Sequence, residues 1–126
     1  MLGAAHAAAN PLTAHFHIVH GQAVGLMLPA VVRFNAADAE TARLYEELDA
    51  GTAAGLGAKL DRLLDLAGLP RSLADCEVAP AAIPLLAAEA AKQWTAAFNP
   101  RAVTEQDFVK LYEAAFAPRP AGPFPP

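Results

Sequence analysis

The four histidines of this 126-residue chain all lie within residues 6–20, close to its start. Imidazole is a good ligand for iron, zinc and nickel, so this is the stretch whose residue types could do chemistry. His6 and His20 are 14 positions apart, and on one continuous helix they would lie roughly 21 Å apart along its axis. A single metal ion could contact both imidazoles only if the chain reversed direction between them.

The residues between the two histidines predict such a reversal. Residues 16–19 end in a β-branched pair that separates two helix-like runs, and Gly21 lets the backbone tighten before an apolar helix begins at Gln22. A helix, a turn and a second helix would therefore bring one imidazole from each arm to one point. Asn10, four residues after His6, shares its helix face.

A structural role for these histidines remains an alternative. A histidine pair in an alanine-rich helix is more often the polar edge of a core, and two histidines are fewer than the usual number of metal ligands. His15 and His17, two positions apart, fall on different faces of any regular element, so we expect that they are not both ligands. Spacing alone leaves a metal site and a structural pair both open.

The histidine stretch and several later runs resemble the signature of the iron-containing (group III) alcohol dehydrogenases, approximately H-x-x-x-H-P-L-G-A, P-H-G, L-L-P-H-V and N. The resemblance extends to about residue 116, and the runs that carry it are residues 3–14, 16–21, 25–29, 32–35, 67–73 and 98–101. It implies a divalent metal (iron, or zinc or nickel), NAD(P) as cofactor, and a small alcohol or aldehyde as substrate. In that family the metal acts as a Lewis acid on the alcohol oxygen while a hydride passes to NAD(P)⁺.

The resemblance also implies roles for individual residues. His6 and His20 take the places of two metal ligands, and Asn10 takes a catalytic position beside the nicotinamide and the substrate. Many members carry a histidine at that position, whereas an amide cannot change its charge near neutral pH, which puts a proton relay there in doubt. Ala30 and Glu77 also depart from the family pattern, but neither replaces a ligand.

No glycine-rich phosphate loop can be found in the chain, so its cofactor-binding residues cannot be assigned. Family members place a dinucleotide-binding domain, and helices that supply an Asp and a further His to the metal, before the part that this chain resembles. We therefore expect the C-terminal part of a metal-dependent NAD(P) alcohol dehydrogenase, inactive as an isolated chain. The alternatives are a non-catalytic, truncated helical module that self-associates and, more weakly, an adventitious metal-binding protein that uses the histidine cluster alone.

Composition predicts an all-α fold. The apolar periodicity over residues 1–116 indicates a bundle of about five to six helices, and the resemblance implies that this bundle corresponds to most of the family's C-terminal domain. The chain has 32 alanines and few β-branched residues. A net charge of −4 with only nine Lys and Arg excludes a basic patch and so disfavours nucleic acid as a partner. Cys76 stands alone, which excludes an internal disulfide and fits the cytoplasm, and we expect it to be buried or half-buried. We find neither a targeting segment nor a membrane span.

Apolar periodicity predicts the individual elements. The first half of the chain should contain an apolar central helix over 22–34, an amphipathic helix over 41–48, a loose connection at Gly51, Gly55 and Gly57, and a helix over 56–67 ended by Gly68. One turn at 72–75 and a helix over 82–98 should follow, with Trp94 and Phe98 as core anchors. A last helix begins with a capping box at 104–107, and residues 117–126 should be a Pro-rich disordered tail. Without the family's preceding helices, the helix over 22–34 would keep an uncovered apolar face. We therefore expect a homodimer, or pairing with the missing N-terminal half.

Overall fold

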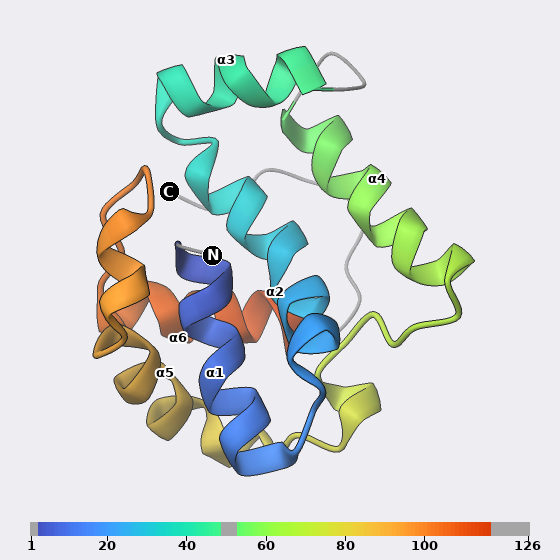
Figure 1. Cartoon of the computed structure of the whole chain (residues 1–126), viewed down its shortest axis with the longest axis vertical. Helices are drawn as coiled ribbons and strands as arrows, with labels where there is room; N and C mark the ends of the chain where they lie inside the picture. Colours follow the sequence, from blue (N-terminus) through green and yellow to red (C-terminus); the bar gives the residue numbers. More distant parts are fainter. Residues whose placement is uncertain (1–2, 49–52, 117–126) are drawn as a thin grey trace.

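The computed structural model describes residues 3–48 and 53–116, which form an all-α fold without a strand (Figure 1). The elements are α1 (Ala4–Phe16), α2 (His20–Asn35), α3 (Ala39–Leu48), α4 (Ala53–Leu66), η1 (Ala74–Cys76), η2 (Pro80–Ala82), α5 (Ile83–Ala91), η3 (Trp94–Phe98) and α6 (Glu105–Phe116), where η marks a short 3-10 helix. The predicted bundle of five to six helices is confirmed. The tail expected at 117–126 lies outside the described residues.

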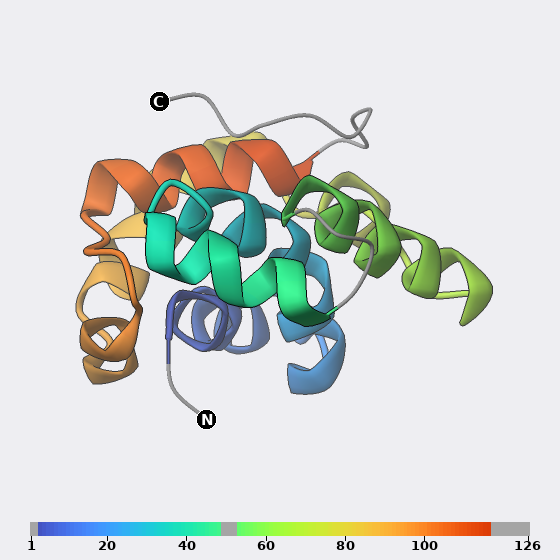
Figure 2. The same ribbon diagram turned by 90° about the horizontal axis from the view of Figure 1, so that it is seen from above.

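Helix α2 is the centre of the fold. It packs against α1, α4 and α6, and the view from above shows it between α1 and α6 (Figure 2). Its buried residues are Ala23, Leu26, Met27, Pro29, Ala30, Val31, Val32, Phe34 and Asn35. The predicted central helix is confirmed, because packing on several sides explains its apolar sequence. The uncovered face expected on it is not found among the described residues, since three helices cover it. In the same part of the chain, no helix combines the length and the apolar character needed to cross a bilayer.

The link at residues 17–19 reverses the chain between α1 and α2, as predicted. His17 adopts the left-handed conformation (φ 57°) and ends α1, its N–H donating to the carbonyl oxygen of Thr13 at 3.1 Å. The Thr13 hydroxyl donates to the carbonyl oxygen of Ile18 at 2.8 Å, which holds the link against the helix end. The link then runs back along α1, so α2 begins beside α1 rather than beyond its end (Figure 1).

The single helix expected over residues 82–98 is wrong, because the structure divides it into two elements. α5 ends at Ala91, Gln93 is extended (φ −71°, ψ 128°), and the chain then turns into the 3-10 helix η3. The cause is a tertiary contact: the break lets η3 reach the start of α1, where the Thr95 carbonyl oxygen accepts a hydrogen bond of 2.9 Å from the N–H of Gly3. A continuous helical stripe in the sequence was outweighed by that contact.

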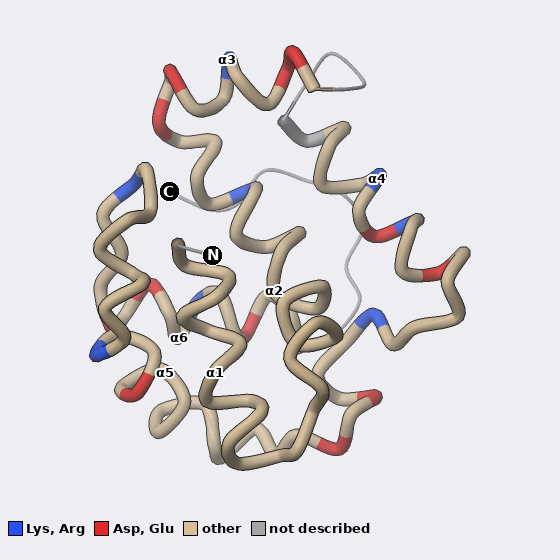
Figure 3. Tube along the Cα trace, in the orientation of Figure 1, with Lys and Arg blue, Asp and Glu red and all other residues tan. Residues whose placement is uncertain are grey.

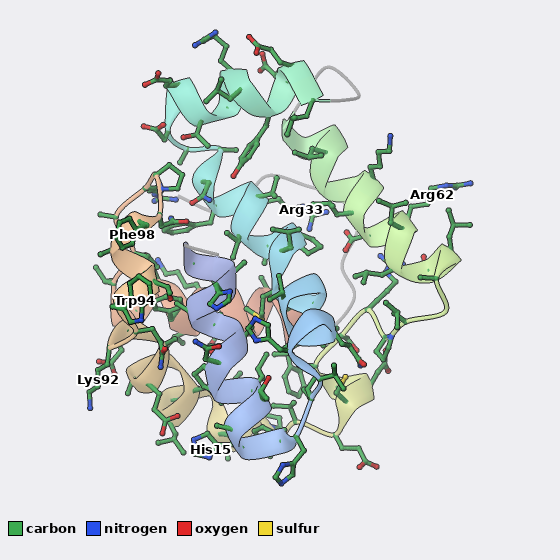
Figure 4. All side chains as sticks on the ribbon, viewed as in Figure 1. His15, Arg33, Arg62, Lys92, Trp94 and Phe98 are labelled. Atoms are coloured by element: carbon green, nitrogen blue, oxygen red, sulfur yellow. The ribbon has the colours of Figure 1, made fainter. Side chains whose placement is uncertain are left out.

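The core-anchor role expected for Trp94 and Phe98 is also wrong. The two side chains are 69% and 58% exposed and point away from the helices at one edge of the molecule (Figure 4). Their ring centroids are 5.9 Å apart with the planes at 89°, an edge-to-face contact of the two rings with each other. The change of helix type at η3 therefore turns both aromatic rings from the core to the surface.

The loose connection expected at the three glycines is wrong for two of them. Gly55 and Gly57 lie inside α4, which begins at Ala53, while Gly51 lies outside the described residues. The close packing of α2 on α4 explains why residue 57 is a glycine, because a Cβ atom there would lie only 3.0 Å from Nε of Arg33. The glycine marks a helix contact rather than a flexible segment.

The predicted helix boundaries at Gly68 and Thr104 are confirmed. Gly68 is left-handed (φ 69°), and its N–H donates to the carbonyl oxygen of Asp65 at 3.0 Å, which closes the C-terminus of α4. At the start of α6, Oδ2 of Asp107 accepts from the N–H of Thr104 at 2.9 Å and the Asp107 N–H donates back to the Thr104 hydroxyl at 3.2 Å. The inner face of α6 is buried as expected and consists of Phe108, Leu111, Tyr112 and Ala115.

Candidate metal centre

His6 and His20 lie against each other, one from each arm of the α1–α2 hairpin. Their ring centroids are 4.6 Å apart and the ring planes make an angle of 66°. His6 lies in the first turn of α1, and His20 is the first residue of α2. The contact depends on the link at 17–19, which starts α2 alongside α1. The structure thus brings together the two imidazoles that the sequence spacing indicated.

The surroundings of His6 favour its neutral form. Burial lowers the pKa of the His6 imidazole, and His20 and the amino terminus lower it further because they disfavour a second positive charge nearby. Its Nδ1 atom is buried without a hydrogen-bond partner among the described residues. α1 carries no Lys, Arg, Asp or Glu, and α2 carries only Arg33 (Figure 3). A neutral imidazole with an unpaired ring nitrogen is the form in which histidine binds a metal.

The pair fits part of a metal site. Protein zinc sites use three or four side-chain ligands, and this pair supplies two. In residues 3–48 and 53–116, no group of three or more His, Cys, Asp or Glu side chains is placed to hold an ion. An ion bound between His6 and His20 would need its other ligands, and the negative charge to balance it, from elsewhere.

Asn10 lies one turn after His6 on α1 and is half-buried. Its Nδ2 donates a hydrogen bond of 3.0 Å to Oε1 of Gln93, which stands in the extended break between α5 and η3. This bond fixes the plane of the Asn10 amide. Sequence reasoning missed Gln93, because no local pattern links it to Asn10, which lies 83 positions earlier in the chain. The polarity of Gln93 in a largely apolar segment was the only signal.

The other two histidines lie apart from the pair. Nε2 of His15 is 2.7 Å from Oε2 of Glu89 on α5, an exposed contact at the far end of α1 (Figure 4). His17 is exposed in the link. Neither imidazole reaches the contact between His6 and His20, so the cluster seen in the sequence separates into one pair and two independent residues.

Cys76 is a half-buried free thiol, as predicted. Burial raises the pKa of the thiol, while Nε2 of Gln22 donates a hydrogen bond to Sγ at 3.7 Å. A thiol held in its protonated form is neither a good nucleophile nor a good metal ligand. Cys76 therefore does not contribute to the candidate centre.

Comparison with known proteins identifies the family. Residues 1–116 match the Fe-containing alcohol dehydrogenase family, C-terminal. This chain belongs to that family. Over 91% of its length, the chain is 32% identical to the lactaldehyde reductase of Escherichia coli (strain K12) and 33% identical to the 1,3-propanediol dehydrogenase of Klebsiella pneumoniae.

Solved structures of iron-containing alcohol dehydrogenases and their relatives share the fold. A 1,3-propanediol oxidoreductase superposes with a TM-score of 0.77 at 32% identity, and an alcohol dehydrogenase from Oenococcus oeni with a TM-score of 0.78 at 29% identity. Each match covers 90% of this chain and 32% of the solved one. The chain therefore spans about a third of the length of its relatives. The resemblance inferred from the histidine-rich stretch is confirmed, as is its restriction to the C-terminal part of the family.

Proposed function

We propose that this chain provides the metal-binding part of a divalent-metal, NAD(P)-dependent alcohol dehydrogenase. The observation that carries the proposal is the contact between His6 and His20, at 4.6 Å between ring centroids, in a member of the iron-containing family. The relatives are named for lactaldehyde and 1,3-propanediol. We accordingly propose a small alcohol and its aldehyde as the substrate pair.

His6 and His20 would each give one ring nitrogen to the ion, which we propose to be iron, or otherwise zinc or nickel. The bound ion would supply Lewis acidity toward an alcohol oxygen, and NAD(P)⁺ the acceptor for a hydride. His6 is suited to this role because its lowered pKa keeps the ring nitrogen free of a competing proton. Asn10 would orient the substrate through hydrogen bonds of its amide, and the transfer of a proton would fall to other groups.

As an isolated chain, this part of the enzyme should be inactive as a dehydrogenase. It covers 33% of the length of lactaldehyde reductase, and its sequence lacks a glycine-rich loop that could hold the phosphates of a dinucleotide. We propose that turnover in the cytoplasm requires a polypeptide that carries the dinucleotide site and further metal ligands.

Calorimetric titration with zinc tests the metal site, with His15 as the matched control because it lies on α1 outside the pair. We expect weak binding by the unchanged chain and by His15→Ala, and loss of binding in His20→Ala. Binding should weaken as the pH falls, because protons compete for the ring nitrogens. Loss of binding in His15→Ala with retention in His20→Ala would overturn the ligand assignment. The same protein with added iron and NAD(P)⁺ should show no alcohol-dependent reduction of the cofactor.

A non-catalytic helical module that self-associates is the second candidate, and a specific observation favours it. Large apolar side chains are exposed on α3, on α4 and just after α4; they are Leu44, Leu48, Leu63, Leu66 and Leu69. Exposed apolar side chains of this size can be buried by a second chain. Titration separates the two candidates, because a module without a metal role would bind no zinc at His6 and His20.

A further inference from the structure

The side chain of Asn99 uses its whole hydrogen-bonding capacity on three separate parts of the fold. Its Oδ1 accepts from the backbone N–H of Ala4 and from Nδ2 of Asn35, both at 3.2 Å. Its Nδ2 donates to Oδ1 of Asn35 and to the carbonyl oxygen of Arg101, both at 2.7 Å. An amide has two donors and two acceptor positions, so all four are occupied.

Two of these partners belong to the helices that carry the histidine pair. Ala4 is the first residue of α1, and its N–H is one of the donors that a helix start leaves without an intrahelical partner. Asn35 is the last residue of α2 and is 3% exposed. Asn99 therefore joins the start of α1 to the end of α2, at the end of the hairpin opposite to the link at 17–19.

The residues on either side of Asn99 strengthen the connection. η3 holds the chain just before α1, through the hydrogen bond of 2.9 Å from the Gly3 N–H to the Thr95 carbonyl oxygen. Arg101 holds the end of α2, because its Nη1 donates to the carbonyl oxygen of Phe34 at 2.8 Å and its guanidinium lies 3.9 Å above the Phe34 ring. The segment of residues 95–101 thus binds both helix ends by several contacts.

The histidine pair depends on how α1 and α2 lie relative to each other. His6 follows Ala4 by two residues, within the same helix turn, and contacts His20 across the two helices. The link at 17–19 joins the helices at one end, and side-chain packing holds their faces together. Asn99 adds directional hydrogen bonds at the other end, which oppose a shift of α1 along α2. A shift of α1 along α2 would separate the imidazoles while leaving both helices intact.

We propose that Asn99 is a positioning residue for the candidate metal centre, fixing the start of α1 against the end of α2 and thereby holding His6 against His20. The inference rests on the proposed function in so far as the pair is a metal site. The effect on geometry is independent of any metal, because the hydrogen bonds of Asn99 involve neither imidazole.

The test compares Asn99→Ala and Asn99→Asp with Thr104→Ala, which removes a cap of α6 without touching either histidine helix. Asn99→Asp keeps the shape of the side chain and the acceptor for the Ala4 N–H but loses both N–H donors. It therefore serves as the test variant if Asn99→Ala does not fold. Two quantities are measured on the purified chain below its melting temperature: the nuclear Overhauser effect between the ring protons of His6 and His20 without metal, and the affinity for zinc.

In both Asn99 variants we expect the nuclear Overhauser effect between the His6 and His20 ring protons to weaken. The zinc affinity should fall about tenfold, as for other residues that support metal ligands. Thr104→Ala should lower the melting temperature and change neither quantity. The proposal would be overturned if the nuclear Overhauser effect between the two rings were unchanged in the Asn99 variants, or if Thr104→Ala weakened it by the same amount. If the unchanged chain binds no zinc but the Asn99 variants still separate the rings, the positioning role stands and the metal function fails.

Discussion

Burial shifts the pKa of three side chains of this protein, each in the direction that favours the uncharged form. It lowers the pKa of His6 and raises the pKa of Cys76 and of Tyr112, so in each case the uncharged form is favoured. The largest cause in each case is burial, which removes the charged form from water. Around His6, α1 carries no Lys, Arg, Asp or Glu and α2 carries only Arg33. A cation brought to His6 therefore meets a ligand free of protons but little negative charge to balance it, and its affinity depends on what other groups approach the pair.

Tyr112 gives a prediction that depends on pH. Its buried hydroxyl donates to the carbonyl oxygen of Ala8 on α1 at 2.7 Å, so Tyr112→Phe should lower the free energy of unfolding by about 1 kcal/mol at pH 7. Because folding raises the pKa of this phenol, the unfolded chain releases the proton first, and the unchanged protein loses stability as the pH rises above about 10.

Tyr112→Phe lacks this ionisable group, so its stability should fall less steeply in alkali than that of the unchanged protein. The difference in unfolding free energy between the two proteins should shrink by up to about 1.4 kcal/mol for each pH unit above the pKa of the phenol in the unfolded chain, so it should reach zero or change sign by about pH 11. Urea unfolding of both proteins from pH 7 to pH 11 measures this difference. A difference that stays constant over this range would contradict the link between burial and protonation at Tyr112.

At the scale of elements, the contact between α2 and α4 combines a glycine with a half-buried ion pair. Nη2 of Arg33 on α2 lies 2.9 Å from Oδ2 of Asp61 on α4, and the guanidinium rests against the backbone at Gly57. A second arginine, Arg71, bonds Asp65 at 3.1 Å beside it. The absence of a side chain at Gly57 is what allows the Arg33 guanidinium to lie so close to α4.

Two glycine substitutions separate helix propensity from packing. Gly21 lies in the first turn of α2, where a Cβ atom would meet no other atom within 4 Å, so Gly21→Ala should raise the free energy of unfolding by about 0.5–1 kcal/mol. At Gly57 the new Cβ would be 3.0 Å from Nε of Arg33, so Gly57→Ala should destabilise because the ion pair with Asp61 must move. Chemical denaturation measures the free energy of unfolding of both variants. If Gly57→Ala raised it as much as Gly21→Ala, Arg33 would have moved without cost and the packing argument would be wrong.

For the molecule as a whole, the exposed leucines predict association. Leu48 and Leu66 are 69% and 70% exposed, on α3 and α4. We expect light scattering at micromolar concentration to show a dimer or a larger species, and Leu48→Glu and Leu66→Glu to shift it toward the monomer. Val19→Glu is the control, since Val19 is 72% exposed on the link of the α1–α2 hairpin. A monomer at all concentrations, or equal dissociation by Val19→Glu, would contradict this assignment of the surface.

The parts of the fold that could be predicted from sequence depend on local spacing. The buried face of α6, the ends of α4 and the reversal between α1 and α2 each follow from residues a few positions apart. The failures lie where a distant contact prevails over the local pattern: residues 82–98 have a helical stripe, but η3 turns toward the start of α1. The candidate centre likewise has one part that could be predicted from sequence and one that could not. The contact between His6 and His20 follows from local spacing, whereas the hydrogen bond between Asn10 and Gln93 joins residues 83 positions apart.

The separation in sequence between Asn99 and α1 also has a consequence for the order of folding. The histidine pair closes 14 positions of chain, whereas the hydrogen bond from Ala4 to Asn99 closes 95. Contacts between near residues form faster, because less chain entropy is lost when they close. The hairpin can therefore assemble early in folding, and the segment that carries Asn99 docks late. Loss of the Asn99 contacts should consequently speed unfolding while leaving the folding rate nearly unchanged, as expected for interactions absent from the transition state.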